Sequence, residues 1–253
     1  MKKTLLLCAV LMLAGTVAAQ QKDAAAPDPA KLRTASAEPG KNQPLPFLRN
    51  NFKLIFAAKK GEEITFDLES RMIGKQEKPI QLKVTMPDGQ AVALEPLPIK
   101  AKQSYSFTPS ADGFCILPVA TGGAGVKLIP GANCRVSAYS DKYFPYWKGT
   151  FFQTFYPPVN TRFYFAVPKG VEEFQMEVGF NGKSTICILD GEGQEKARLE
   201  EMKGKKLVTL KRDKKDAEIW TVVLVKGTHN GFRFFEPVSP IVSFDKNDLA
   251  VAE

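Results

Sequence analysis

The sequence predicts an all-β fold made of two tandem antiparallel β-sandwich domains, placed after a signal peptide and a disordered linker. Short runs rich in Val, Ile, Phe, Tyr and Thr recur between clusters of Gly, Pro, Asp and Asn, a spacing typical of a sandwich or barrel. Evidence for helices after the N-terminal leader is poor. One pattern also occurs twice, as FKLIFAAKKGEEITFDL at 52–68 and FYFAVPKGVEEFQMEV at 163–178. Two copies of one strand order indicate two copies of one domain.

The first 19 residues are predicted to be a secretory signal peptide. Lys2 and Lys3 precede an apolar run at 5–14, and small residues lead to a cleavage site after Ala19. The apolar run is about half of the ~20 residues that a membrane-spanning helix needs. We therefore expect a secreted, periplasmic or cell-surface protein with no transmembrane segment after signal removal.

Residues 20–46 are predicted to be a disordered linker. Ala, Pro, Lys and Ser dominate this stretch and no apolar periodicity appears, so little surface could be buried to offset the entropy of ordering it. Two β-sandwich domains are expected after it, at 47–142 and 143–253.

Alternation of apolar and polar residues locates the expected strands. In the first domain they lie at 51–57, 62–69, 80–86, 90–95, 103–107, 113–119, 125–129 and 133–139. In the second they lie at 151–156, 161–166, 172–179, 184–189, 194–200, 205–210, 217–225 and 231–236. Asp88-Gly89 and Asp190-Gly191 are expected to form equivalent hairpin turns.

The same alternation predicts which side chains build the cores. Ile64, Phe66 and Leu68 share one face of a strand, and Phe174, Met176 and Val178 repeat this in the second copy. The strand at 217–225 is apolar on both faces, which predicts a central strand with Trp220 at its start.

The formal net charge of +8 comes from basic residues that are mostly dispersed. Two clusters, at 203–206 and 211–215, flank LVTL and indicate solvated strand ends. Because no basic helix or stacking motif accompanies them, nucleic acid is not an expected partner. Weak attraction to anionic polymers of the cell envelope is compatible with this charge.

Three cysteines remain after removal of the leader. Cys115 and Cys134 lie in neighbouring strand-like segments, and an oxidising compartment would permit a disulfide between them. Whether they pair depends on chain geometry. Cys187, within STICILD, is expected to be a small core residue.

Residues suited to catalysis are scarce. His229 is the only histidine and lies in a turn signal, which argues against a histidine-based metal site or triad. The acid pairs at 62–63 and 172–173 are adjacent within strands, so their side chains point to opposite faces and cannot form a glycosidase pair. No enzyme activity, metal or cofactor is therefore expected.

The linking stretch at 143–165 holds 11 of the 26 aromatic residues. Its rings could form an exposed platform that stacks on sugars, or an interface between the domains. Tyr143, Tyr146 and Trp147 surround Pro145, where regular pairing should fail, and are the candidate ligand-binding residues.

The series of aromatic strand, VPKG, alternating strand and DG hairpin resembles bacterial pre-peptidase C-terminal domains. FYFAVPKGVEEFQMEV and CILDGEGQEKARL carry this resemblance, and FRFFEPVSPIVSF is similar to the β-sandwich modules appended to exported glycoside hydrolases. The resemblance implies jelly-roll-like sandwiches that bind, shield or target and are not themselves catalytic.

The leading hypothesis is an exported non-catalytic protein that binds a glycan or another cell-envelope polymer. One alternative is a structural or assembly protein of the envelope, with a protein partner. Another is an unrecognised hydrolase that uses scattered carboxylates.

Overall fold

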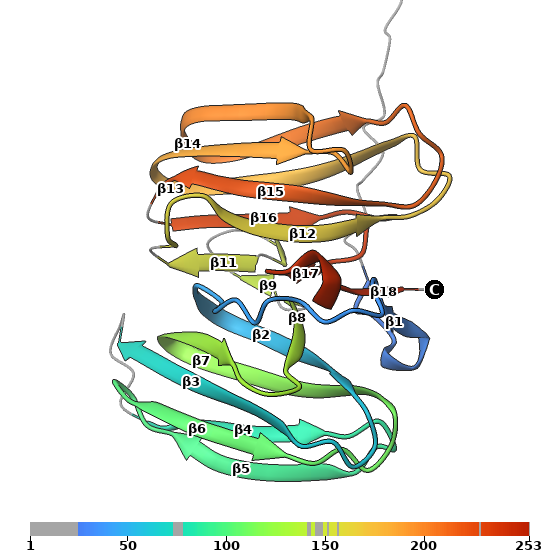
Figure 1. Ribbon diagram of the computed structural model, residues 1–253. Helices are drawn as coiled ribbons and strands as arrows, with labels where there is room; N and C mark the ends of the chain where they lie inside the picture. The colour runs from blue at the N-terminus through green and yellow to red at the C-terminus, as the bar shows by residue number, and fades with distance from the viewer. Residues whose placement is uncertain are drawn as a thin grey trace, which may run out of the picture.

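The computed structural model describes residues 25–72, 78–140, 143–144, 149–150, 152–155, 157–227 and 229–252. Within these residues, antiparallel strands dominate, and the other regular elements are two 3-10 turns, Pro29–Lys31 and Lys246–Asp248. This confirms the predicted all-β sandwich class. Figure 1 shows two stacked halves, with the strands from the first part of the chain below and those from the second part above.

The lower half contains seven strands in chain order. They are β2 (Phe47–Ala58), β3 (Ile64–Met72), β4 (Ile80–Thr85), β5 (Ala91–Leu97), β6 (Lys102–Phe107), β7 (Gly113–Pro130) and β8 (Arg135–Tyr139). β2 pairs with β7 and β8, β3 pairs with β6 and β7, and β4 pairs with β5 and β7. The long strand β7 thus contacts three others along its length.

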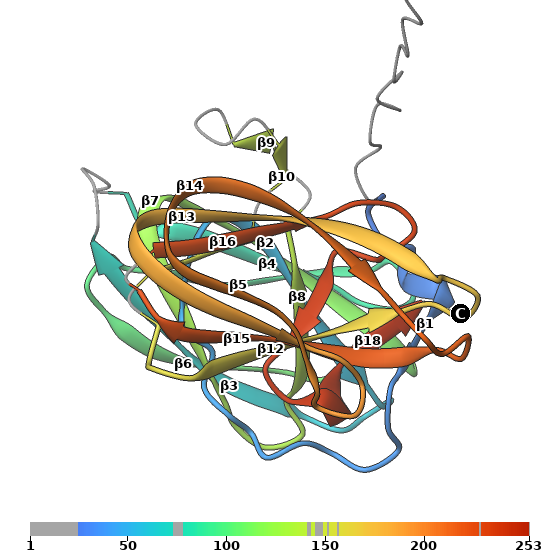
Figure 2. The same cartoon turned by 90° about the horizontal axis from the view of Figure 1, so that it is seen from above.

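The upper half repeats this pairing scheme. Its strands are β11 (Phe152–Phe155), β12 (Thr161–Val167), β13 (Glu173–Leu189), β14 (Glu195–Lys211), β15 (Glu218–Lys226), β16 (His229–Phe234) and β17 (Ile241–Ser243). β12 pairs with β15 and β17, as β2 does with β7 and β8, while β13 pairs with β14, β15 and β16. Between the halves, β9 (Tyr143–Phe144) and β10 (Gly149–Thr150) form a separate two-stranded sheet that stands off the body in Figure 2.

The Lys-Gly turns of the repeated pattern have the same geometry in both halves. Gly61 and Gly170 have φ angles of 76° and 81°, in the left-handed region that glycine adopts without strain. The Gly61 N–H donates to the Pro109 carbonyl at 3.0 Å, and the Gly170 N–H donates to the Lys215 carbonyl at 2.7 Å. Each turn therefore fixes the loop that leads into the later aromatic strand of its own half.

The hairpin turns are also equivalent, but with a different glycine than the sequence predicts. Gly89 has a φ of 85°, and its counterpart is Gly193, with a φ of 81°. Both glycine N–H groups close the turn by donating to the carbonyl three residues earlier. The prediction that Gly191 plays this part was wrong. Both loops have five residues, 86–90 and 190–194, and the glycine with positive φ is the fourth residue of each, so Gly191 is the counterpart of Pro87.

The core faces predicted from alternation are confirmed. The side chains named above on β3 and β13 are all buried: Ile64, Phe66, Leu68, Phe174, Met176 and Val178. β15 lies between β12 and β13 in the sheet, and Trp220 near its start is fully buried. The prediction of a central strand here therefore holds.

Three expected pairs of short strands are single long strands. β7, β13 and β14 run through glycine-containing segments that the sequence indicates as breaks. Gly122 and Gly123 in β7 have positive φ angles, and the β13–β14 register shifts between Phe180 and Ser184. Glycine here bends a continuous strand instead of ending it.

Two strand pairings join the halves across the predicted boundary at residue 142. β8 pairs with β17, and β2 pairs with β11. Buried side chains of both halves, including Phe56 and Phe163, also form one hydrophobic cluster. Because the halves share a sheet and a core, the division into two domains stays a prediction.

The prediction of disorder for the linker does not hold for residues 25–46, which we call the strap. β1 (Leu32–Thr34) pairs with β18 (Ala250–Ala252) near the other end of the chain, as Figure 1 shows. Leu32 and Leu45 are buried. Within the described residues, no helix has the length and apolar composition needed to cross a membrane.

Candidate functional site

A groove of about 760 Å³ lies where the strap enters β2, between the two halves. The lower wall comes from the end of the strap, β3 and β7, and the upper wall from the start of β12 and the end of β17. The lining residues are Gln43, Pro44, Leu45, Pro46, Phe47, Arg71, Lys127, Pro158, Val159, Asn160, Thr161, Arg162, Tyr164 and Phe244. Its volume is within the range of small-molecule sites.

Three cationic side chains line this groove. The Arg71 guanidinium lies 4.6 Å from the centre of the Phe47 ring, and the Lys127 ammonium lies 5.9 Å from the same ring. Lys127 also lies 3.9 Å from Glu69, at the outer limit of an ion pair. Arg162 is exposed and makes no ion pair or side-chain hydrogen bond with the described part of the chain.

A tight turn before β12 forms the upper rim of the groove. Asn160 has a φ of 62°, and its N–H donates to the Leu224 carbonyl at 2.9 Å. The Thr161 hydroxyl donates to the Pro158 carbonyl at 2.7 Å. Val159, at the tip, is 72% exposed, an unusual position for a large apolar side chain. These bonds fix the rim and leave the Asn160 amide exposed.

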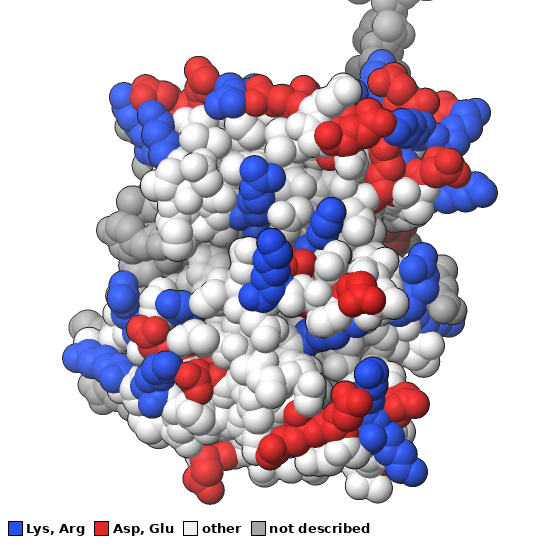
Figure 3. All heavy atoms as spheres, in the orientation of Figure 1, with Lys and Arg blue, Asp and Glu red and all other residues white. Residues whose placement is uncertain are grey.

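Among the described residues that line the groove there is no Asp or Glu. Its floor is apolar, because Leu45, Phe47 and Phe244 are buried, while Tyr164 is half-buried at the wall. Cationic groups above an apolar floor create a positive potential that is screened less than on an open surface. Figure 3 shows mixed acidic and basic side chains toward the upper and lower ends of one face, and several Lys or Arg side chains with fewer acidic ones across its middle.

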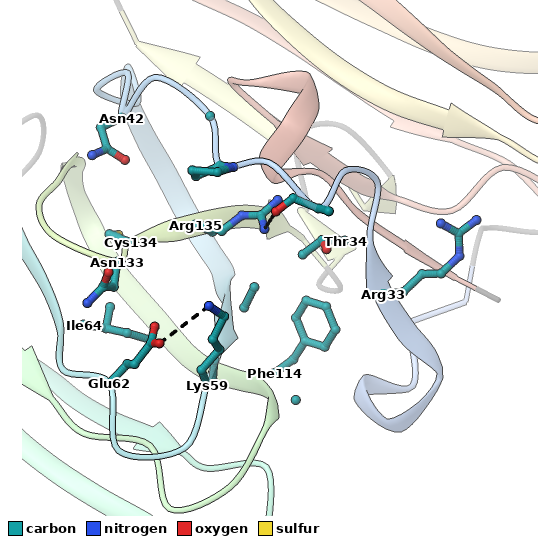
Figure 4. A pocket seen from close by; sticks show the side chains of 16 residues that line it. Arg33, Thr34, Asn42, Lys59, Glu62, Ile64, Phe114, Asn133, Cys134 and Arg135 are labelled. Atoms are coloured by element: carbon teal, nitrogen blue, oxygen red, sulfur yellow. Dashed lines mark hydrogen bonds and ion pairs between the residues drawn. The ribbon is translucent and has the colours of Figure 1, made fainter.

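A second cavity, of about 560 Å³, lies between the strap and the ends of β2 and β7. Figure 4 shows Lys59 and Glu62 facing each other within it, at 3.5 Å, with Phe114 close to Lys59. Arg33 points away from the cavity, and Arg135 points toward the strap.

Arg135 and Asp248 hold the strap over this cavity. The Arg135 guanidinium donates to Asp248 Oδ1 at 3.1 Å and to the carbonyls of Ser36 and Asn247, both at 2.7 Å. Asp248 Oδ1 also accepts the Gly40 N–H at 2.9 Å. Burial raises the pKa of Asp248, although the Gly40 and Arg135 hydrogen bonds oppose this. Because these polar groups form hydrogen bonds with one another, we interpret their role as holding the strap in place and not as binding a ligand.

A third, acidic cleft of about 670 Å³ lies beside the hairpin that follows β13, and Arg162 and Tyr164 line both this cleft and the groove. Asp190 accepts the Glu192 and Gln194 N–H groups at 3.0 and 2.9 Å, and Glu218 accepts from Arg212 and Trp220 at 3.0 and 3.1 Å. Burial raises the pKa of Asp190, but its hydrogen bonds and Lys196 lower it further, so the net shift is downward. Both carboxylates thus stabilise local structure.

The possible Cys115–Cys134 disulfide is absent, and both thiols are free and buried. Cys115 on β7 is opposite Phe56 of β2, whereas Cys134 directly precedes β8, on the other side of β2. Two residues separated by a strand are roughly 10 Å apart, beyond the ~7 Å limit for a disulfide. Burial raises the pKa of each thiol to about 12.

Cys187 is buried on β13, as expected of a core residue. Its thiol contacts Glu195 Oε2 at 3.3 Å. Burial, together with Glu195, raises its pKa to about 11. Within the described residues, no group of three His, Cys, Asp or Glu side chains is placed to hold a metal ion.

The structure does not place the aromatic residues predicted to bind ligand in a site. Tyr143 begins β9, while Tyr146 and Trp147 lie outside the described residues. Their role stays a prediction. Further along the same stretch, Phe163 and Phe165 are fully buried, and β11 joins the halves, as an interface would require.

Sequence alone could not have located the groove. Arg71, Lys127 and Arg162 are far apart along the chain and lie in otherwise ordinary alternating strands. Only the pairing of β2 with β11 and of β8 with β17 brings their walls together.

No protein-family model and no curated protein matches this chain. Distant likenesses exist among solved structures. The M60 catalytic domain with two CBM51 domains of Clostridium perfringens ZmpB is 10% identical, over 87% of this chain and 38% of that one, with a TM-score of 0.25. The Arthrobacter globiformis T6 isomalto-dextranase complexed with panose is 10% identical, over 76% and 35%, with a TM-score of 0.25. A fucolectin from striped bass, Morone saxatilis, is 8% identical, over 81% and 84%, with a TM-score of 0.22.

The chain spans little more than a third of the length of the first two of these structures. Likenesses this distant carry no argument about the function of this chain.

Proposed function

We propose that this protein is an exported, non-catalytic protein that binds carbohydrate in the groove between its halves. The observation that carries this proposal is the groove itself: a cavity of ligand size that combines an apolar floor, planar side chains and exposed polar groups. Because the groove lies at the junction, both halves contribute residues to its walls.

The chemistry of the groove suits a sugar. A pyranose ring presents apolar C–H faces and a rim of hydroxyl groups. The half-buried Tyr164 ring offers a flat surface with a polar end, and the Asn160 amide can both donate and accept hydrogen bonds. Arg71, held against Phe47, adds guanidinium donors in a fixed plane.

Two observations favour binding over catalysis. Asp190 and Glu218 in the acidic cleft are occupied with backbone N–H groups and basic side chains. All three described thiols have pKa values raised by burial to about 11 or 12, so they remain protonated and weakly nucleophilic at neutral pH. The described cavity walls therefore offer no activated nucleophile. Export rests on the leader at 1–19.

Binding to a panel of polysaccharides, measured by calorimetry with the mature protein, tests the proposal. We expect Tyr164→Ala to weaken binding roughly fivefold, because an aromatic contact contributes about 1 kcal/mol, and a melting curve checks that the variant is folded. Trp147→Ala is the comparison variant, since Trp147 belongs to the aromatic segment that the sequence predicts to bind ligand. If no polysaccharide binds, the proposal fails. If only Trp147→Ala weakens binding, the site lies in the 143–147 segment.

A further inference from the structure

Two of the three cationic side chains of the groove, Arg71 and Arg162, make no ion pair with the described residues, whereas many surface cations of this protein do. Elsewhere, Lys102, Lys205 and Lys215 lie within 2.8 to 3.1 Å of an acid. In the groove, Arg71 contacts a ring, Arg162 has no ion pair within the described residues, and Lys127 has one acid at 3.9 Å. Their charge is therefore not neutralised locally.

We propose that the ligand is an acidic polysaccharide, whose carboxylate or sulfate groups bind Arg71 and Arg162. This inference rests on the proposed carbohydrate-binding function and specifies its substrate class. A guanidinium is charged at every physiological pH and matches the two oxygens of a carboxylate or sulfate with paired hydrogen bonds. A neutral sugar would leave both guanidinium charges without a counter-charge.

The geometry of Arg71 supports this assignment. Its guanidinium packs against the Phe47 ring, and that ring is buried in the floor of the groove. A planar cation held on an aromatic face loses little freedom when a ligand binds at its edge. The Phe47 ring therefore holds the Arg71 guanidinium in an orientation in which it can bind an oxyanion.

The two arginines come from opposite walls. Arg71 lies near the end of β3 in the lower half, whereas Arg162 lies near the start of β12 in the upper half. A ligand that contacts both must bridge the two walls of the groove. A chain of acidic sugar units can do so with a separate anionic group for each arginine.

Nucleic acid is also a polyanion, but the groove fits it less well. Binding of single strands uses exposed aromatic rings on which bases stack. Here Phe47 and Phe244 are buried, and Tyr164 is half-buried. The described walls thus offer one partly exposed ring, Tyr164, and not the series of exposed rings on which successive bases stack.

The test compares polygalacturonate, dextran sulfate, neutral dextran, galacturonic acid monomer and oligo-dT by calorimetry at low and high salt. We expect at least tenfold tighter binding of one acidic polysaccharide than of dextran, weakening as salt increases. Polygalacturonate and dextran sulfate separate carboxylate from sulfate as the anion. The monomer should bind at least tenfold more weakly than its polymer.

Arg71→Gln and Arg162→Gln should each weaken binding of the acidic polymer about fivefold to tenfold. Arg33→Gln is the matched control, because Arg33 is an exposed arginine that points away from its cavity. Melting temperatures report whether each variant is folded.

The possible failures are distinguishable. Equal binding of dextran with no effect of either arginine variant overturns the acidic ligand, but leaves the groove proposal standing if Tyr164→Ala still weakens binding. Oligo-dT binding as tightly as the acidic polysaccharides also overturns it. Binding of no polysaccharide overturns both proposals.

Discussion

Asp248 is a buried carboxylate that receives a guanidinium and a backbone N–H at the edge of the strap. Its side chain is only 5% exposed, and it contacts both Arg135 and Gly40. A side chain at Gly40 would clash with Asp245 and Asp248, so this close contact requires glycine. One residue thus fixes three segments, from the strap, β8 and the end of the chain.

The stability contributed by Asp248 should fall as pH rises. Burial raises its folded-state pKa above the ordinary value of 3.8, so the folded state binds the proton more tightly than the unfolded state. Its contribution is complete below pH 3.8 and is lost as pH rises through the folded pKa. The unfolding free energy of the wild type minus that of Asp248→Asn should therefore decrease with pH in denaturant titrations.

Asp67→Asn is a control for which we expect the opposite pH dependence of stability. Hydrogen bonds from Lys102 and Ser104 lower the pKa of Asp67, so its contribution is present above 3.8 and lost as pH falls. The wild-type-minus-variant difference should rise with pH for this residue. A rise for Asp248 as well would show that Arg135 outweighs burial there.

At the scale of elements, the strap shows which strands a sequence pattern cannot predict. Strands such as β3 and β13 were predictable because each alternates apolar and polar residues over several positions. β1, β17 and β18 span three residues each, and β1 pairs with a partner more than two hundred residues away. No local pattern records such a pairing, so the strap resembles a disordered linker in sequence.

Leu45→Ala tests whether the strap belongs to the folded core. Leu45 is 2% exposed, and removing a buried leucine side chain costs about 2–5 kcal/mol. Leu207→Ala makes the same change at a position that is 45% exposed on β14, where we expect a loss of no more than ~0.5 kcal/mol. Equal effects in urea unfolding would mean that the strap is a loose tether, as its composition predicts.

At the scale of the whole molecule, the groove depends on how the halves meet. Sequence repetition predicted two similar units, and their pairing schemes are indeed similar. It could not predict that β8 would pair with β17 and β2 with β11, because those contacts link residues roughly a hundred apart. The candidate site lies at this junction, and its residue types are unremarkable until the halves are joined.

An amide-resolved NMR titration of the mature protein with short oligogalacturonates tests the central claim most directly. We predict chemical-shift changes that saturate at Arg71, Asn160, Thr161 and Arg162, with little change at Lys59 beside the second cavity. Saturable changes confined to 143–150, or centred on the second cavity, would contradict a binding groove between the halves.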